Sequence, residues 1–138
     1  MSAATQAQSY ERRWQRFMQN PRILVERIYL PLVMLALHNW GKHHLYLALD
    51  TTVLWDEYCM IHLSVVCCGR AVPFLWQVLK HESAMVSSVS YRDLFRKAHW
   101  LLRAYPEVML LADRGFACHE LLAWLETRQW HYALRFAK

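Results

Sequence analysis

The sequence predicts an α/β protein with a mixed sheet. Two short apolar runs, residues 45–49 and 108–112, each end at an aspartate, as strands inside a sheet often do. Between and after these runs, segments with helical spacing alternate with segments of period two. Strands joined first by short connections and then by helices form a sheet with both antiparallel and parallel pairs.

The composition is that of a globular chain, because 56% of the 138 residues are hydrophobic and 20% are charged. The longest stretch without a charged residue, residues 28–41, is shorter than the roughly 20 residues a membrane helix needs, so no membrane partner is expected. The net charge of +5 favours polyanionic partners such as nucleic acid. Four cysteines without a C-x-x-C pair, and no secretory leader, predict free thiols in a cytoplasmic protein.

The chain begins with a segment that predicts helices. Residues 8–18 are charged and compatible with a helix. Asn20 and Pro21 then predict the N-cap and the first position of a second helix, which runs towards Trp40. Pro31 is expected to kink or restart that helix, because proline removes a backbone donor.

Three strands are predicted next. Residues 45–49 form the first, which is expected to be buried on both faces. From residue 59 to residue 67, apolar side chains alternate with more polar ones, so the second strand has one buried face. A turn at residues 68–70 leads to a third strand, residues 71–79, paired antiparallel with the second. Pro73 indicates an edge position for this strand.

Helices and strands alternate in the second half. A helix begins at Ser90, where Asp93 completes an approximate capping box, and Pro106 ends it. Residues 108–112 form the fourth strand. Right-handed crossovers bring the first and fourth strands side by side at the centre of the sheet. The last predicted elements are a turn at Gly115, a helix around residues 121–125 and a strand over residues 130–136.

Both central strands end in an acid, Asp50 for the first and Asp113 for the fourth. In open α/β sheets, ligands bind at the carboxyl ends of the strands. Neighbouring carboxylates repel each other unless a cation lies between them, and Mg²⁺ prefers such hard oxygen ligands. Alternatively, Asp50 starts a turn and Asp113 caps the next helix. The pattern alone leaves both interpretations open.

The first acid stands in Leu-Ala-Leu-Asp50-Thr51-Thr52, and the second in Leu-Leu-Ala-Asp113-Arg114-Gly115-Phe116. These blocks resemble the first two catalytic blocks of DDE transposases from bacterial insertion sequences, and the second block is the more specific. Other segments that fit this family are Gly-Arg-Ala-Val-Pro at residues 69–73, Trp76, Trp-His-Tyr at residues 130–132, Arg12-Arg13, and Asn20-Pro21-Arg22.

The resemblance implies an RNase H-like domain over residues 42–138, with strand order 3-2-1-4-5 and flanking helices, after an N-terminal helical segment over residues 1–41. It implies that Asp50 and Asp113 are catalytic residues and ligands of Mg²⁺ or Mn²⁺. The activity it implies is metal-dependent cleavage and strand transfer of DNA at the ends of a mobile element. The residues expected to contact DNA are Arg114, Arg12, Arg13 and Arg22.

Members of the family carry a third acid, a glutamate, on a helix after the fifth strand. Glu120 and Glu126 precede that strand, so neither is expected to replace it, and the domain is expected to be incomplete and inactive alone. A second hypothesis is a non-catalytic fragment that binds DNA or a full-length transposase and interferes with it, and a third is a decayed relic. Exposed apolar surface predicts self-association.

Two further features stay open. Trp55 follows Asp50 beside Asp56 and Glu57, so it either touches DNA, covers the site or packs inside the protein. The eight histidines include no pair with the spacing of a zinc protease helix, and they are expected to be solvent-facing or hydrogen-bonded in place.

Overall fold

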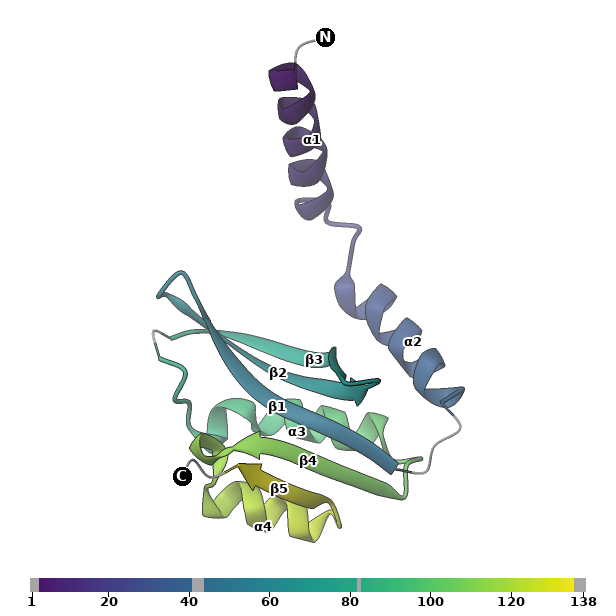
Figure 1. Ribbon diagram of the computed structural model, residues 1–138, viewed down its shortest axis with the longest axis vertical. Coiled ribbons are helices and arrows are strands. Elements are labelled where there is room, and N and C mark those ends of the chain that lie inside the picture. The colour runs from purple at the N-terminus through teal and green to yellow at the C-terminus, as the bar shows by residue number, and fades with distance from the viewer. Residues whose placement is uncertain (1–2, 41–43, 82, 136–138) are drawn as a thin grey trace. The chain divides into compact units, whose positions relative to one another are not determined.

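The computed structural model describes residues 3–40, 44–81 and 83–135, and the chain forms two compact units, Met1–Trp40 and Gly41–Lys138. The first unit contains α1 (Ala3–Met18) and α2 (Val25–His38) (Figure 1). The boundary predicted between residues 41 and 42 lies outside the described residues.

The start of α2 differs from the prediction. Asn20 does not cap the helix, because α2 begins only at Val25, with Leu24 at the N-cap. The Asn20 Oδ1 instead accepts a hydrogen bond from the backbone N–H of Arg22 at 3.0 Å. Asparagine side chains readily bond the backbone two residues on, and this local turn competes with capping. Pro31 lies inside α2, which continues through it.

The second unit is built on one five-stranded sheet. Its strands are β1 (His44–Leu54), β2 (Tyr58–Cys67), β3 (Arg70–Lys80), β4 (Glu107–Asp113) and β5 (His131–Arg135). The order is β3-β2-β1-β4-β5, with β1–β2 and β2–β3 antiparallel and β1–β4 and β4–β5 parallel. The predicted mixed RNase H-like sheet and its order 3-2-1-4-5 are confirmed. Residue 136 of the predicted fifth strand lies outside the described residues.

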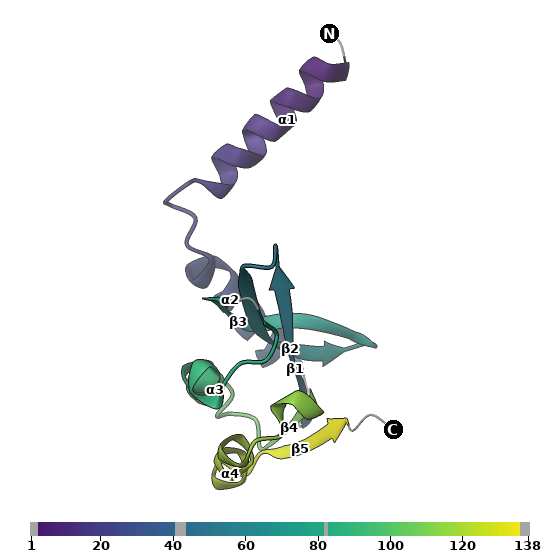
Figure 2. The ribbon, with the colours of Figure 1, turned by 90° about the vertical axis from the view of Figure 1, so that its left-hand side faces the viewer.

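Two helices cover one face of this sheet, α3 (Ser88–Leu101) and α4 (His119–Thr127) (Figure 2). In β1, the buried side chains are Leu45, Leu47 and Leu49, whereas Tyr46 is 46% exposed. The predicted burial of this strand on both faces is therefore wrong. Alternating residues of a strand project to opposite faces, and α3 and α4 cover only the leucine face.

The β2–β3 hairpin confirms the predicted edge strand. Its turn places Cys68 at φ 49° and Gly69 at φ 74°, a conformation that glycine adopts without steric cost. The register changes within the hairpin, so that Phe74 is the extra residue of a bulge next to Pro73. A bulge on an edge strand accommodates proline, which has no N–H to donate to the ladder.

An aromatic core lies under the helices. Phe95 of α3 is 2% exposed, and its ring centroid lies 5.6 Å from that of Trp124 and 6.3 Å from that of Trp130. The helix α3 begins two residues before Ser90, and its N-cap is Ser87. The predicted capping box is therefore wrong.

Among residues 3–40, 44–81 and 83–135, no helix has both the length and the hydropathy that a membrane crossing requires.

Candidate active site

The parallel register of the two central strands brings the predicted acids to the same level. Strands β1 and β4 pair from His44 opposite Glu107 to Ala48 opposite Leu111. Two residues further along each strand stand Asp50 and Asp113. Side chains two residues apart share a face, so both acids project from the face of Ala48 and Leu111, opposite to the buried leucines.

The two strands part at this level. Beyond Ala48, β1 continues in register with β2, where Asp50 stands opposite His62, as far as Leu54. Strand β4 continues with β5, where Asp113 stands opposite Arg135. Figure 1 shows β1 leaving β4 as it runs towards the β1–β2 turn. Open sheets bind ligands where neighbouring strands part at their carboxyl ends, so this position suits a site.

One oxygen of each carboxylate accepts a hydrogen bond from a backbone N–H group. The Asp50 Oδ1 accepts a hydrogen bond from the N–H of Thr51 at 2.8 Å, and the Asp113 Oδ1 accepts one from the N–H of Gly115 at 2.8 Å. The second bond caps the short 3-10 helix η1 (Arg114–Phe116), so Asp113 caps a helical turn, as one of the two open interpretations held, although Cys118 is the N-cap of the longer helix α4. Asp50 starts no turn, because it lies within β1.

Gly115 gives the Asp113 carboxylate room. A Cβ atom at this position would lie 3.0 Å from the Asp113 Oδ1, closer than most real contacts of that kind. Within the described part of the chain, the second oxygen of neither Asp50 nor Asp113 makes a hydrogen bond. One oxygen of each acid is therefore anchored by the backbone, and the other remains open to a ligand.

The donor set fits a hard divalent cation. Asp50 and Asp113 are both exposed, and carboxylate oxygens are ligands that Mg²⁺ and Mn²⁺ accept. No group of three or more His, Cys, Asp or Glu side chains in the described residues could hold a metal ion. Two protein carboxylates leave the remaining positions around Mg²⁺ to water or to substrate phosphate oxygens. The arrangement therefore suits a metal that can also contact a phosphorylated substrate.

The predicted DNA-contacting arginines fall into two places. Arg114 lies on η1, directly after Asp113, and is exposed. Arg12, Arg13 and Arg22 are exposed residues of the first unit, and the guanidinium of Arg13 lies 4.9 Å from the ring centroid of Tyr10. Among these four arginines, Arg114 is therefore the residue that lies next to one of the two predicted catalytic acids.

Two basic residues that flank the acids in space were not predicted as site residues from the sequence. Arg135 is the register partner of Asp113, and His62 is the register partner of Asp50. The signal was present, because both residues lie in segments predicted as strands. Identifying them would have required the register between neighbouring strands, and hydrophobic periodicity does not give that register.

Trp55 does not pack inside the protein, because it is 85% exposed at the β1–β2 turn. Trp55 and Asp56 have φ angles of 54° and 53°, and the N–H of Glu57 donates to the carbonyl of Leu54 at 3.2 Å. Two left-handed residues closed by this bond form a turn that normally takes asparagine and glycine. The packing interpretation of Trp55 is therefore wrong.

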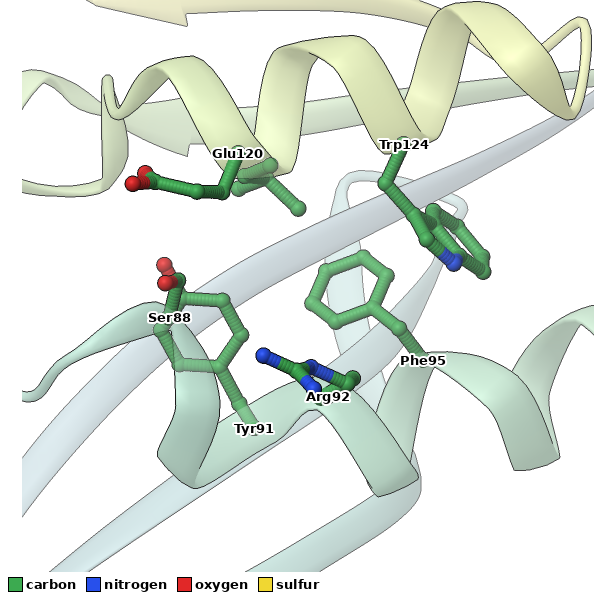
Figure 3. Close-up of a pocket in the computed structure, with 7 residues that line it drawn as sticks. Ser88, Tyr91, Arg92, Phe95, Glu120 and Trp124 are labelled. Carbon is green, nitrogen blue, oxygen red and sulfur yellow. The ribbon is translucent and has the colours of Figure 1, made fainter.

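A small hollow lies between α3 and α4, on the helix-covered face (Figure 3). Ser88, Tyr91 and Arg92 of α3 face Glu120 and Trp124 of α4. Burial, followed by a hydrogen bond to Cys118, raises the pKa of Tyr91 well above its ordinary value, so its hydroxyl stays protonated. The volume of about 50 Å³ is far below that of a small-molecule site.

No protein-family model matches the chain, and no curated protein matches it either. One solved structure with a similar fold is that of the Mos1 transposase catalytic domain and raltegravir with Mn, at 15% sequence identity and a TM-score of 0.47. The match covers 82% of this chain and 60% of that chain.

Proposed function

We propose that this chain is part of a DDE-type transposase catalytic domain, from an enzyme that cuts and joins DNA strands with Mg²⁺ or Mn²⁺. The observation that carries the proposal is the position of Asp50 and Asp113 on adjacent parallel strands, at the level where these strands part. The sequence blocks around the two acids resemble the family's first two catalytic blocks. The sheet order is the one that this resemblance implies.

In this proposal Asp50 and Asp113 would hold the divalent cation through their open oxygens. When bound, the cation would supply charge stabilisation at a phosphodiester and activation of a water or hydroxyl group for in-line attack. The protein's own part is to orient the carboxylates, through the N–H groups of Thr51 and Gly115. The net charge of +5 favours the approach of DNA.

Two carboxylates without a further acid bind a cation weakly, and the loss of a catalytic group commonly lowers a rate by several orders of magnitude. The 138-residue chain is therefore expected to bind metal and DNA without completing strand transfer. Partners of this activity are the DNA ends of the element, with a second copy or a full-length transposase supplying what the site lacks.

The test is a titration of Mn²⁺ followed by electron paramagnetic resonance, with wild type, Asp50→Asn and Asp113→Asn. We expect both substitutions to abolish the specific binding, since each removes a ligand charge and keeps the backbone hydrogen bond. Asp93→Asn is the matched control, because Asp93 is an exposed carboxylate on α3 that pairs with Arg96 at 3.3 Å. Binding of Mn²⁺ that ignores both site substitutions contradicts the proposal.

A DNA-binding assay separates the non-catalytic alternative. The two exposed arginines on α1, Arg12 and Arg13, would carry DNA binding that is salt-dependent and indifferent to metal. If Arg12→Gln with Arg13→Gln abolishes DNA binding while the two aspartates bind no Mn²⁺, the interfering fragment is the better proposal. A nicking or strand-transfer activity that Asp113→Ala abolishes would instead refute the expected inactivity of this chain.

A further inference from the structure

A row of polar side chains crosses the sheet at the level of the two acids. Asp113 stands opposite Arg135, Asp50 stands opposite His62, and His62 stands opposite Trp76. Register partners on neighbouring strands project to the same face. From one sheet edge to the other, the order is therefore Trp76, His62, Asp50, Asp113 and Arg135, with a basic residue beyond each acid.

The two ends of this row differ in how much their side chains are already engaged. The Nδ1 of His62 lies 3.2 Å from the Oγ of Ser64, a residue that is only 2% exposed, and His62 itself is half-buried. Arg135 is exposed, and it makes no ion pair with any other residue that the structure describes. The guanidinium of Arg135 is therefore the cation of the row that is open to a ligand.

We infer that Arg135 binds a non-bridging oxygen of the phosphodiester that the acids and their metal would receive, which deepens the proposed function and rests on it. Adjacent strands lie about 4.8 Å apart, so Arg135 is one strand from Asp113 and two strands from Asp50. A guanidinium offers paired N–H donors that match phosphate oxygens. Because it stays protonated, it balances the phosphate charge without competing for the metal.

Arg135 is a better candidate for the phosphate contact than Arg114, because Arg135 lies beside Asp113 in the sheet. Arg114 follows Asp113 directly in the chain, and it belongs to η1, beyond the last pair of β4 and β5. Consecutive residues at a strand end project in different directions, so Arg114 leaves the row that holds the acids. Arg135 is 22 positions from Asp113 in the numbering and its direct neighbour in the sheet.

The test compares Arg135→Gln, Arg135→Lys and Arg114→Gln in the 138-residue chain, with Arg92→Gln, an exposed arginine on α3, as the matched control. Binding of a short fluorescein-labelled DNA duplex is followed by anisotropy in Mg²⁺, over about 50 to 200 mM NaCl. We expect Arg135→Gln to weaken binding about tenfold and Arg135→Lys to weaken it less. The slope of log K against log [NaCl] should fall by about one for Arg135→Gln, as for one lost phosphate contact.

Binding of Mn²⁺ without DNA separates the possible failures. We expect Arg135→Gln to leave it unchanged, whereas Asp113→Asn abolishes it. If Asp113→Asn has no effect on Mn²⁺, the proposed function fails. If Mn²⁺ binds as proposed but Arg135→Gln affects DNA no more than Arg92→Gln, the inference on Arg135 fails. A loss of Mn²⁺ binding and of folding stability in Arg135→Gln would make Arg135 a structural partner of Asp113 and overturn the inference as well.

Discussion

The clearest test of the site is a substitution whose effect on stability changes sign with metal. Asp50 and Asp113 place two negative charges on adjacent strands at one level. Like charges across a strand pair destabilise a sheet by roughly 0.2 to 1 kcal/mol. In Asp50→Asn the amide oxygen can still accept the 2.8 Å bond from the Thr51 N–H. The free energy of unfolding should therefore rise by up to about 1 kcal/mol in buffer with EDTA.

Magnesium should reverse this order. A ligand that binds only the folded state stabilises it by RT ln(1 + [L]/Kd), which is about 1.4 kcal/mol at about 10 mM Mg²⁺ and a Kd of about 1 mM. Wild type gains this stabilisation, and Asp50→Asn loses most of it with the ligand charge. The variant is then expected to be more stable than wild type without metal and less stable than wild type with it.

The assay is urea unfolding followed by circular dichroism, in EDTA and in MgCl₂, with ionic strength matched by NaCl. Asp93→Asn should show no such change of sign, because its carboxylate faces Arg96 on the surface of α3. A variant at Asp50 that is less stable than wild type in both buffers would show a structural aspartate. The reasoning would also be refuted if the free energy of unfolding of the wild type were the same in EDTA and in MgCl₂.

Three further outcomes follow from the structure. Trp55→Asn should raise the free energy of unfolding by about 0.5 to 1 kcal/mol in urea, because asparagine tolerates the left-handed turn better. Burial, and then the charge of Arg128, lowers the pKa of His99, so the unfolded chain binds this proton more readily. The free energy of unfolding should be at its full value above pH 6.5, the ordinary pKa of His99, and should decrease below it. In His99→Phe, the free energy of unfolding should depend less on pH over this range. Burial raises the pKa of the Cys59 thiol, so a thiol reagent should modify exposed Cys68 quickly and Cys59 only on unfolding.

The sheet was predictable from sequence because three independent rules agree on it. Period two between residues 59 and 67 gives a half-buried strand, Pro73 excludes a central position, and right-handed crossovers place β4 beside β1. Each rule depends on local residues or on chain handedness. These rules give β3 an edge position and bring β1 beside β4, whereas the full order β3-β2-β1-β4-β5, with β5 beyond β4, was implied by the family resemblance.

The predictions were wrong where one local sequence feature was compatible with two different structures. Asn20 was expected to cap a helix, but its side chain bonds the Arg22 N–H in a turn instead. The strand β1 was expected to end at Asp50, yet it runs to Leu54 because β2 supplies its backbone partners as far as Tyr58. The strand end was inferred from where apolar residues stop, whereas pairing with a neighbour decides where a strand stops.

The two interpretations of Asp113 that the sequence left open do not exclude each other. Capping η1 uses the Oδ1, which accepts the Gly115 N–H, and the second oxygen stays open. A carboxylate held at one oxygen by the backbone loses rotational freedom, and so it meets a cation at a smaller entropic cost. The same bond favours glycine at position 115, because a Cβ atom there would lie 3.0 Å from the Oδ1 and the carboxylate would have to shift. The Asp-Arg-Gly block can therefore be understood as a single device, in which the glycine admits the carboxylate, the cap orients it, and the strand places it beside Asp50.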